Sequence, residues 1–308
     1  MSLSTYNFIW KLLEFILPRY LEKRKNNGKE DIHRIHERYG ISKKNRPSGT
    51  LVWLHASSVG ESVAALALAN SMRKNGYGNK DNEYFLLTTN TLSAAKLIKD
   101  KIKKGLPAIH QYHPYDHPKF VSKFLNHWQP NMAVFLESDF WPNLIYLTTK
   151  TKIPTILASS QMSEKSARFW SGIGIFLAKK IFGNVNQVLA VDPKQADLFK
   201  RLGAKNIKSL TSLKSIAEKP IINQNYIHNI KKKLVKKKIL LAASTHPGEE
   251  ELMIKLANLL RQNAEDKILI IIAPRHIKRS LAIQNLVKSA GFDIKSRSKG
   301  EFPSKTDQ

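Results

Sequence analysis

The 308-residue chain contains no cysteine, which excludes disulfides, thiolate metal ligands and a cysteine nucleophile. No apolar run reaches about 18 residues, the length at which a helix can span a bilayer. Lys11 and Glu14 interrupt the N-terminal apolar stretch, so no signal peptide is expected. Acidic residues are scarce: 24 Asp and Glu stand against 51 Lys and Arg, and the formal charge is +27. This excess predicts an anionic partner, which is nucleic acid, a membrane surface or a phosphorylated substrate, unless it serves solubility alone.

Several motifs with known chemistry are also missing from the sequence. There is no GxxxxGK[ST] loop, no GxGxxG run, no HExxH and no GxSxG, which removes the usual signs of a P-loop, a dinucleotide site, a zinc protease and an esterase. His110, His113 and His117 lie close together, but the prolines between them favour a loop over a metal site. No helix-turn-helix or basic-aromatic sheet signature is present, so no nucleic-acid partner is expected.

The N-terminal segment is apolar and then basic. Residues 6–17 would form a helix of roughly 18 Å, too short to span the hydrocarbon core, with Phe8, Trp10 and Phe15 placed among lipid headgroups. A basic cluster follows at Arg19, Lys23, Arg24, Lys25 and Lys29. The pattern predicts a monotopic anchor for an anionic leaflet. The alternative is a helix that packs on the protein's own core.

Beyond residue 48, short β-branched runs alternate with helical patterns. Strands are predicted at 50–54, 84–89, 132–136, 154–158, 187–191, 239–243 and 268–273, and helices at 61–75, 92–104, 117–128, 163–181, 194–202, 248–262 and 278–290. This alternation predicts an α/β fold with a parallel sheet covered on both faces.

The predicted elements divide the chain into four parts. They are an N-terminal segment at 1–39, a Rossmann-like domain at 40–217, a basic linker at 218–237 and a second unit at 238–308. The second unit has two clear strands, whereas a doubly wound domain usually has about six. We therefore expect the second domain to be incomplete.

Polar motifs follow the predicted strands, at the edge where open α/β sheets bind ligands. HASSVGES at 55–62 offers Ser58 and Gly60 before a helix whose free N–H groups can bind an anion. Glu61 lies in the first turn of that helix, where the helix dipole is expected to lower its pKa slightly and keep it ionised as a proton acceptor. The alternative is an ordinary first-turn glutamate.

Two further motifs follow the next strands. ESDFWPN at 137–143 carries Glu137 and Asp139, and Trp141 offers a flat apolar surface for a sugar ring or an acyl chain. Its alternative is a capping cluster with a core tryptophan. SSQMSEKS at 159–166 places Ser163 at a helix start, where it either caps the helix or contacts a phosphate.

The last two motifs belong to the second unit. ASTHPGEEE at 243–251 places Ser244, Thr245 and His246 before a helix, which predicts an anion or sugar pocket. APRHIKR at 273–279 adds His276 and Arg275, whose guanidinium can bind phosphate or carboxylate through two parallel bonds.

Taken in this order, the motifs resemble those of the Kdo transferases, which transfer 3-deoxy-D-manno-octulosonic acid (Kdo) from CMP-Kdo to the lipid A precursor. The resemblance covers most of the chain and includes GKE at 28–30 and ERYG at 37–40. It implies a GT-B-like fold of two Rossmann-like, doubly wound parallel-sheet domains, the acceptor side first and the second domain incomplete. It also implies an inverting, metal-independent reaction without a cofactor.

The resemblance assigns roles to individual residues. Glu61 becomes the general base that takes a proton from the acceptor sugar hydroxyl. The acceptor side comprises Ser58, Gly60, Glu137, Asp139, Trp141 and Ser163, and the donor side comprises Lys214, Ser244, Thr245, His246, Glu249, Arg275 and His276. The implied location is the cytoplasmic face of the bacterial inner membrane, on an anionic surface. The two phosphates of the acceptor would account for the +27 charge.

The sequence departs from the family pattern in several places. Asp139 stands where the family usually has glutamate, Gln161 stands where it has arginine, and Thr211 and Ser212 replace a Gly-Asn pair before Leu213 and Lys214. The family also continues with a GELG segment and a Gly-Gly-His-Asn run. We therefore expect a C-terminally truncated chain that binds CMP very weakly, transfers no Kdo and tends to aggregate. The alternatives are a related GT-B glycosyltransferase with another donor sugar, and a non-enzymatic basic protein of a membrane surface.

Overall fold

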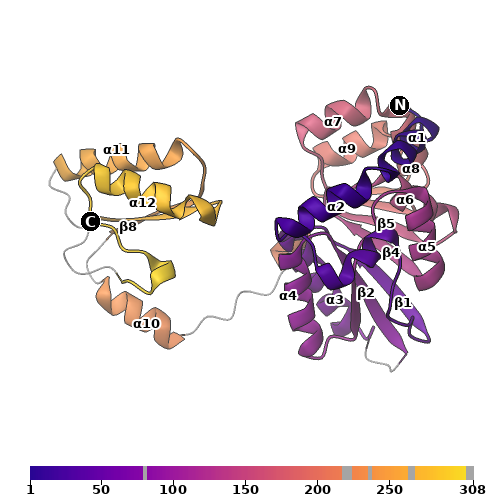
Figure 1. The fold of residues 1–308 in the computed structure, drawn as a ribbon, viewed down its shortest axis with the longest axis horizontal. Helices are drawn as coiled ribbons and strands as arrows, with labels where there is room; N and C mark the ends of the chain where they lie inside the picture. Colours follow the sequence, from indigo (N-terminus) through magenta and orange to yellow (C-terminus); the bar gives the residue numbers. More distant parts are fainter. Residues whose placement is uncertain (79–81, 217–223, 235–237, 263–267, 303–308) are drawn as a thin grey trace. The chain divides into compact units, whose positions relative to one another are not determined.

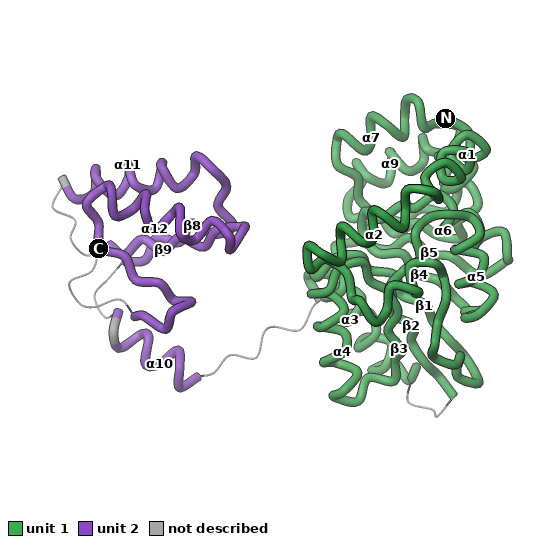
Figure 2. Tube along the Cα trace, viewed as in Figure 1, with its two compact units in different colours: residues 1–218 green, residues 219–308 purple. Residues whose placement is uncertain are grey.

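The chain forms two compact units, residues 1–218 and 219–308 (Figures 1 and 2). The computed structural model describes residues 1–78, 82–216, 224–234, 238–262 and 268–302. The first unit contains the larger sheet and the N-terminal helices, and the second contains two strands with three α-helices. Each unit is described separately.

Unit 1 is built on a seven-stranded sheet in which every neighbouring pair is parallel. The strands are β1 (Thr50–His55), β2 (Glu83–Thr89), β3 (Ala108–Tyr112), β4 (Met132–Leu136), β5 (Thr155–Ser160), β6 (Gln187–Ala190) and β7 (Ile207–Ser209), in the order β3-β2-β1-β4-β5-β6-β7. The prediction of a doubly wound parallel sheet is confirmed. The strand order reverses between β1 and β4, and ligands of such sheets bind beyond the carboxyl ends of the strands at that point.

Alternate side chains of the strands enter two separate cores. Leu51 and Trp53 of β1 face a core formed with α5 (Pro118–Trp128), α6 (Pro142–Lys150), α8 (Ile175–Phe182) and α9 (Pro193–Arg201). Val52 and Leu54 face a second core formed with α3 (Val59–Lys74) and α4 (Leu92–Lys103). Because both faces are covered, β1, β2 and β4 have long apolar runs. Such burial contributes about 25 cal/mol for each Å² of apolar surface, and it holds the strand ends that carry the site.

Some predicted elements differ from the observed ones. Strands β3 and β7 and helix α6 were not predicted, and the predicted helix 163–181 is two helices, α7 (Glu164–Ser171) and α8, separated at Gly172–Gly174. The expectation that His110 lies in a loop is wrong, because His110 is a buried residue of β3. β3 contains the polar pair His110 and Gln111, whose side chains are buried with hydrogen-bond partners, so its pattern does not indicate an apolar strand.

The N-terminal segment consists of α1 (Leu3–Glu14), α2 (Leu17–Asn26) and a 3₁₀ segment, η1 (Ile32–Tyr39), rather than one helix at 6–17. Leu3 is buried in the first core, and Leu17 and Leu21 pack against Phe120. The placement of Trp10 among lipid headgroups is not what the structure shows, because its ring contacts Tyr115 and His117 of the protein. Within the described residues, no helix is long and apolar enough to cross a membrane.

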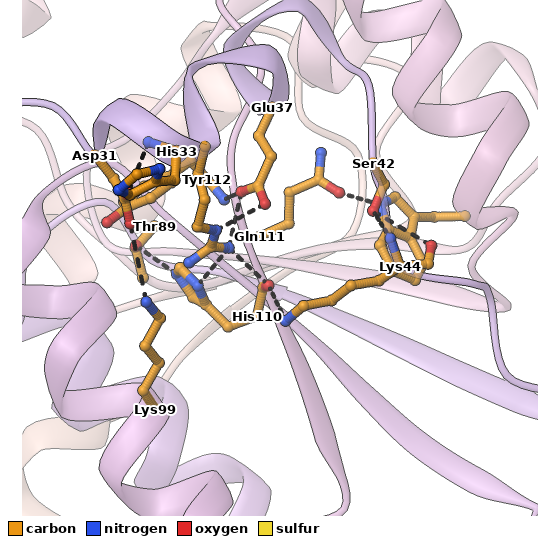
Figure 3. Close-up of polar contacts among 12 residues, drawn as sticks. Asp31, His33, Glu37, Ser42, Lys44, Thr89, Lys99, His110, Gln111 and Tyr112 are labelled. Atoms are coloured by element: carbon orange, nitrogen blue, oxygen red, sulfur yellow. Dashed lines mark hydrogen bonds and ion pairs between the residues drawn. The ribbon is translucent and has the colours of Figure 1, made fainter.

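Polar side chains fasten η1 and the residues after it to the edge strand β3 (Figure 3). Glu37 accepts the backbone N–H of Tyr112 at 2.7 Å and two bonds from Arg34, and Lys44 donates to the carbonyl of His110 at 3.1 Å. η1 ends at Gly40, which has φ +75°; a Cβ there would lie 2.0 Å from the Phe120 carbonyl oxygen. The GKE and ERYG motifs therefore have a structural role in this unit.

Arg38 and Glu30 of the N-terminal segment form a buried ion pair, with 1% of each side chain exposed. Arg38 donates twice to Glu30, at 3.0 Å each, and once each to the carbonyls of Asn90 and His113. Glu30 also accepts a bond from Arg24. Arg38 thus fixes the loops that follow β2 and β3, and the second of these carries His113 to the site described below.

Unit 2 contains a parallel pair of strands, β8 (Lys238–Thr245) and β9 (Ile268–Pro274), with α10 (Gln224–Lys233), α11 (Glu249–Gln262) and α12 (Ser280–Ser289). Much of the apolar surface of β8 is exposed, including Ile239 and Leu241. The stretch 218–237, which the sequence describes as a basic linker, includes α10. Ile230 of this helix and Leu234 directly after it line an apolar cavity of unit 2. The rest of that stretch, 218–223 and 235–237, lies outside the described residues.

Candidate active site at the carboxyl ends of β1 and β4

The polar motifs of unit 1 meet where the strand order reverses. His55 ends β1, and the loop behind it leads into α3; Glu137 and Asp139 follow β4 and lead into α6. The two strands are direct neighbours, with His55 opposite Phe135. The fold therefore brings HASSVGES and ESDFWPN together although they lie far apart in the sequence.

Glu61 is held by a capping box at the start of α3. Ser58 is the N-cap, and its hydroxyl accepts the Glu61 N–H at 3.3 Å. In return, the Glu61 carboxylate accepts the N–H groups of Ser57 at 2.5 Å and Ser58 at 3.3 Å. Both bonds reach Oε2, and within the described residues no hydrogen bond to Oε1 is found. Glu61 is thus part of the helix cap, and its carboxylate is held by the backbone of the same loop.

The pKa of Glu61 is raised, not lowered. Burial is the largest cause and the charge of Asp139 is the second, and together they outweigh His55 and the two backbone N–H groups. The sequence-based expectation that the helix dipole lowers this pKa is therefore wrong, because the carboxylate lies in a largely buried cluster and not on an exposed first turn. A carboxylate with a raised pKa is a stronger proton acceptor once it is ionised.

Asp139 is bound to residues of β1 and the loop after it. His55, which is fully buried, places Nε2 2.8 Å from Asp139 Oδ2, and the hydroxyl of Ser57 donates to the same oxygen. Burial opposes ionisation of Asp139, but the hydrogen bonds that it accepts from His55 and Ser57 help to hold its pKa well below the ordinary value. Asp139 is therefore a fixed anion beside Glu61.

His113 and Trp141 close one side of this cluster. The His113 ring lies 5.1 Å from that of His55 and 5.7 Å from that of Trp141, measured between centroids. Burial, and next the neighbouring His55, lower the pKa of His113 to about 3, so it is neutral. Trp141 packs against the first core. Trp141 is only partly buried, so its packing on the core leaves the predicted contact with a sugar ring or an acyl chain as a prediction.

Glu137 and Lys214 form an ion pair on the other side of Gly60. Lys214 Nζ lies 2.8 Å from Glu137 Oε1, and a Cβ added at Gly60 would meet Nζ at 3.5 Å. Glu137 has φ +58°, a strained backbone for a residue with a side chain, directly after β4. Lys214, which the resemblance places on the donor side, thus belongs to the same cluster of unit 1 as Glu61.

Ser163 has a different environment from the other acceptor-side residues. Its hydroxyl accepts the Ser166 N–H at 3.3 Å and caps α7, and the residue is exposed. The structure shows the capping role predicted for it and does not place it in the Glu61 cluster.

In unit 2, the predicted donor-side residues surround the start of α11. The hydroxyl of Thr245 donates to Glu250 at 2.7 Å, and the His246 N–H donates to Glu249 at 2.7 Å. Arg279 makes two bonds of 2.8 Å to Glu250 and lowers its pKa. The Thr245 hydroxyl and the His246 N–H, which the sequence predicted to bind an anionic ligand, thus bind the carboxylates of Glu250 and Glu249.

The remaining predicted residues of unit 2 lie around the same strand ends. Ser244 has φ +60° and the backbone N–H of Arg275 donates to Thr245. The rings of His246 and His276 lie 6.4 Å apart. The predicted donor pocket therefore has its residues at two neighbouring strand ends, β8 and β9. Whether they bind a donor remains a prediction.

The sequence did not reveal four residues that support these sites. Thr88 of β2 bonds His55, and Trp53 of β1 bonds Thr88 in turn; in unit 2, Glu250 and Arg279 bind Thr245. Thr88 follows an apolar run near the end of β2, as His55 does in β1. This position could have identified Thr88 from the sequence. Among the residues that the structure describes, no group of three His, Asp or Glu side chains could hold a metal ion.

The overall architecture is similar to that of solved enzymes with a GT-B-type fold. The chain aligns with a UDP-GlcNAc 2-epimerase from Neisseria meningitidis, solved with UDP-GlcNAc bound, at a TM-score of 0.51 and 11% identity, covering 78% of this chain and 70% of that one. A putative UDP-N-acetylglucosamine 2-epimerase from Listeria monocytogenes also has a TM-score of 0.51, with 9% identity over 79% of this chain and 66% of that one. The chain is thus an α/β protein of the GT-B class.

Sequence comparison identifies the family within this class. Residues 33–217 match the family model described as 3-deoxy-D-manno-octulosonic-acid transferase (kdotransferase), and the chain belongs to this family. It is 33% identical over 280 residues to the 3-deoxy-D-manno-octulosonic acid transferase of Rickettsia bellii, and 31% identical over 292 residues to a probable mitochondrial one of Arabidopsis thaliana. These alignments cover 91% and 93% of this chain, and the chain spans 65% and 64% of the two relatives.

Proposed function

We propose that the protein takes part in an inverting transfer of Kdo from CMP-Kdo to a lipid A precursor, with Glu61 as the general base. The observation that carries the proposal is the Glu61 carboxylate at the strand-order reversal of a Kdo transferase domain, with Oε2 bound by two N–H groups and a raised pKa. An acceptor hydroxyl at Oε1 would transfer its proton to Glu61 as its oxygen attacks the anomeric carbon of Kdo. The bond from that carbon to the phosphate of CMP breaks, and CMP leaves.

The charges around Glu61 support this assignment. Asp139 is held as an anion by His55 and Ser57, so it does not compete with Glu61 for the substrate proton. Lys214 is paired with Glu137 at the edge of the same cluster, where its ammonium can also contact an anionic substrate group. We propose that no metal or other cofactor is needed, and that the excess of basic residues attracts the phosphates of the acceptor.

The experiment is a transfer assay on the product of the whole reading frame, with CMP-Kdo as donor and a lipid A precursor as acceptor. We expect Kdo transfer that continues after EDTA removes divalent cations. Transfer from another nucleotide sugar, but not from CMP-Kdo, would support the alternative donor. Absence of transfer from any donor, in a protein that still binds membranes, would support the non-enzymatic alternative.

We further propose that unit 1 binds the cytoplasmic face of an anionic inner membrane. The outer face of α1 and its junction with α2 expose Phe8, Leu12, Phe15 and Ile16, of which Phe15 is 84% exposed. Lys23, Arg24 and Lys25 follow in the last turn of α2. The inner face packs on the protein through Leu3 and Leu17, so the segment combines the two alternatives considered from the sequence.

A second exposed apolar group adjoins this face. Ile173 lies between α7 and α8 and is 75% exposed, and Phe176 lies in α8 and is 74% exposed. The N-terminal amine of Met1 donates to the Ile173 carbonyl. Figure 1 shows α1 at the same end of unit 1 as α7 and α8. We call the exposed residues Phe8, Leu12, Phe15, Ile16, Ile173 and Phe176 the apolar patch. Its exposed aromatic and aliphatic side chains and its basic neighbours suit an interfacial anchor.

Replacing Phe15 or Ile173 by glutamate should weaken binding to vesicles that contain anionic lipid. Burial of an apolar side chain contributes about 1.5–3 kcal/mol, so each variant should lose about tenfold or more in affinity, as measured by vesicle sedimentation. Added salt should weaken binding of the unchanged protein. The control is Leu210→Glu, at an exposed apolar residue that follows β7. Equal binding of all four proteins would place the anchor elsewhere.

A further inference from the structure

We propose that His55 is a positioning residue for Glu61: Trp53 and Thr88 fix the orientation of the His55 ring, which holds Asp139 and, through Ser57, the carboxylate of Glu61. The inference deepens the proposed function and depends on Glu61 being the base. It concerns residues that make no direct contact with the reacting atoms, so their effect must pass through the hydrogen bonds described next.

Four hydrogen bonds lead from the core to Ser57, and a fifth joins Ser57 to the base. The Trp53 indole N–H donates to Thr88 Oγ1 at 2.7 Å, and Thr88 Oγ1 lies 2.8 Å from His55 Nδ1. His55 Nε2 then contacts Asp139, which accepts the Ser57 hydroxyl on the same oxygen. Trp53, Thr88 and His55 are all fully buried, and buried side chains joined in this way keep a single geometry.

The chemistry of the donors determines where the protons lie. An indole N–H can only donate, so Thr88 Oγ1 must accept from Trp53. Thr88 keeps its own hydroxyl proton, which it can donate to His55 Nδ1. With Nδ1 as the acceptor, the imidazole proton lies on Nε2. That proton faces Asp139. The opposite tautomer would set the Nε2 lone pair against a carboxylate, so Asp139 favours the form with the proton on Nε2, and a donating Thr88 hydroxyl supports the same form at Nδ1.

Ser57 connects Asp139 to Glu61. Ser57 donates its hydroxyl to Asp139 and its backbone N–H to Glu61 Oε2. A shift of Asp139 would therefore move the amide that orients the Glu61 carboxylate. Asp139 also acts by charge, because it is the charged side chain that most opposes ionisation of Glu61.

The charged and titratable groups near Glu61 come from four places in unit 1. They are His55 at the end of β1, His113 after β3, Glu137 and Asp139 after β4, and Lys214 in η2 (Leu213–Ile216). Lys214 and Glu137 compensate each other and His113 is neutral. Removal of the Asp139 charge should therefore lower the pKa of Glu61.

The first test reads the tautomer of His55 by ¹⁵N NMR of the histidine-labelled chain, and it needs no activity. We expect the proton on Nε2 in the unchanged protein and a loss of this single form in Thr88→Val, which has nearly the same shape without the hydroxyl. The matched control is Thr89→Val. Thr89 is the next residue of β2, is equally buried, and bonds His110 instead (Figure 3).

The second test follows the carboxyl of Glu61 by ¹³C NMR and, in the whole gene product, the pH profile of transfer. Asp139→Asn should move the Glu61 titration and the acidic limb of the profile to lower pH. Thr88→Val should lower kcat by about ten- to hundredfold, as for other partners that orient a functional histidine, with little change in KM. Asp139→Glu, which keeps the charge, should restore the Glu61 titration.

Each result bears on one of the two proposals. A proton on Nδ1 of His55, an unmoved Glu61 titration in Asp139→Asn, or equal kcat losses in Thr88→Val and Thr89→Val would overturn the positioning role. The expected NMR results in a protein that transfers no Kdo would leave the linkage from His55 to Glu61 in place and reject the proposed function instead.

Discussion

Replacement of Glu61 by glutamine should lower the turnover of Kdo transfer by about 10²–10⁴-fold, the usual contribution of a general base. The amide oxygen of glutamine can still accept the N–H groups of Ser57 and Ser58, so the capping box and the fold should survive. The measurement is kcat from a transfer assay on the whole gene product, with circular dichroism to confirm folding. Binding of the donor should change little.

The pH dependence gives a second sign of the same role. Because the pKa of Glu61 is raised, transfer by the unchanged enzyme should fall as the pH drops through that raised value and the base becomes protonated. Glu61→Gln should lose this limb. Glu164 serves as the control, since it also lies in the first turn of a helix behind a serine cap. If Glu61→Gln and Glu164→Gln are equally active, the base is another residue.

Replacement of Arg38 by methionine should destabilise unit 1 by about 3–5 kcal/mol, the usual cost of leaving one member of a buried ion pair without its partner. Glu30 and the carbonyls of Asn90 and His113 would each lose a donor in a buried place. The five tryptophans of the chain all lie in unit 1. Urea unfolding followed by tryptophan fluorescence therefore reports this unit alone.

Two companion variants separate the ion pair from general disruption. Arg24→Met removes the outer partner of Glu30, 25% exposed, while Arg38 remains, so we expect a loss of about 1 kcal/mol or less. Glu30→Gln combined with Arg38→Met should cost less than the sum of the two single changes, because neither then leaves a lone buried charge. An Arg38→Met loss no larger than that of Arg24→Met would show that the network contributes little to stability.

Strands could be predicted from the sequence where burial on both faces makes a segment continuously apolar. β1, β2 and β4 are interior strands of the sheet and carry apolar side chains on both faces. Their continuous apolar runs therefore predicted them correctly. β3 is an edge strand whose His110 and Gln111 are buried through contacts with residues from distant parts of the chain. No local pattern reports such partners, and for this reason that strand was missed.

The site shows the same division. The place of Glu61, at a strand end before a helix, follows from local sequence and from the family resemblance. The direction of its pKa shift does not, because it depends on burial and on Asp139, which only the sheet topology brings near. Likewise, the sequence identified His55 as part of a motif but could not show that Trp53 and Thr88 fix the orientation of its ring.

The long-range contacts of α1 also have a consequence during synthesis. Tyr6 bonds Asp116, which is 110 residues further along the chain, and Asp116 in turn accepts the first N–H groups of α6 at Asn143 and Leu144. At about 5–20 residues per second, a ribosome needs roughly 5 to 20 s to add that length. Throughout this interval α1 has left the ribosome without its partners, and its whole apolar surface is available to a bilayer. Membrane contact can therefore precede completion of the domain that α1 later joins.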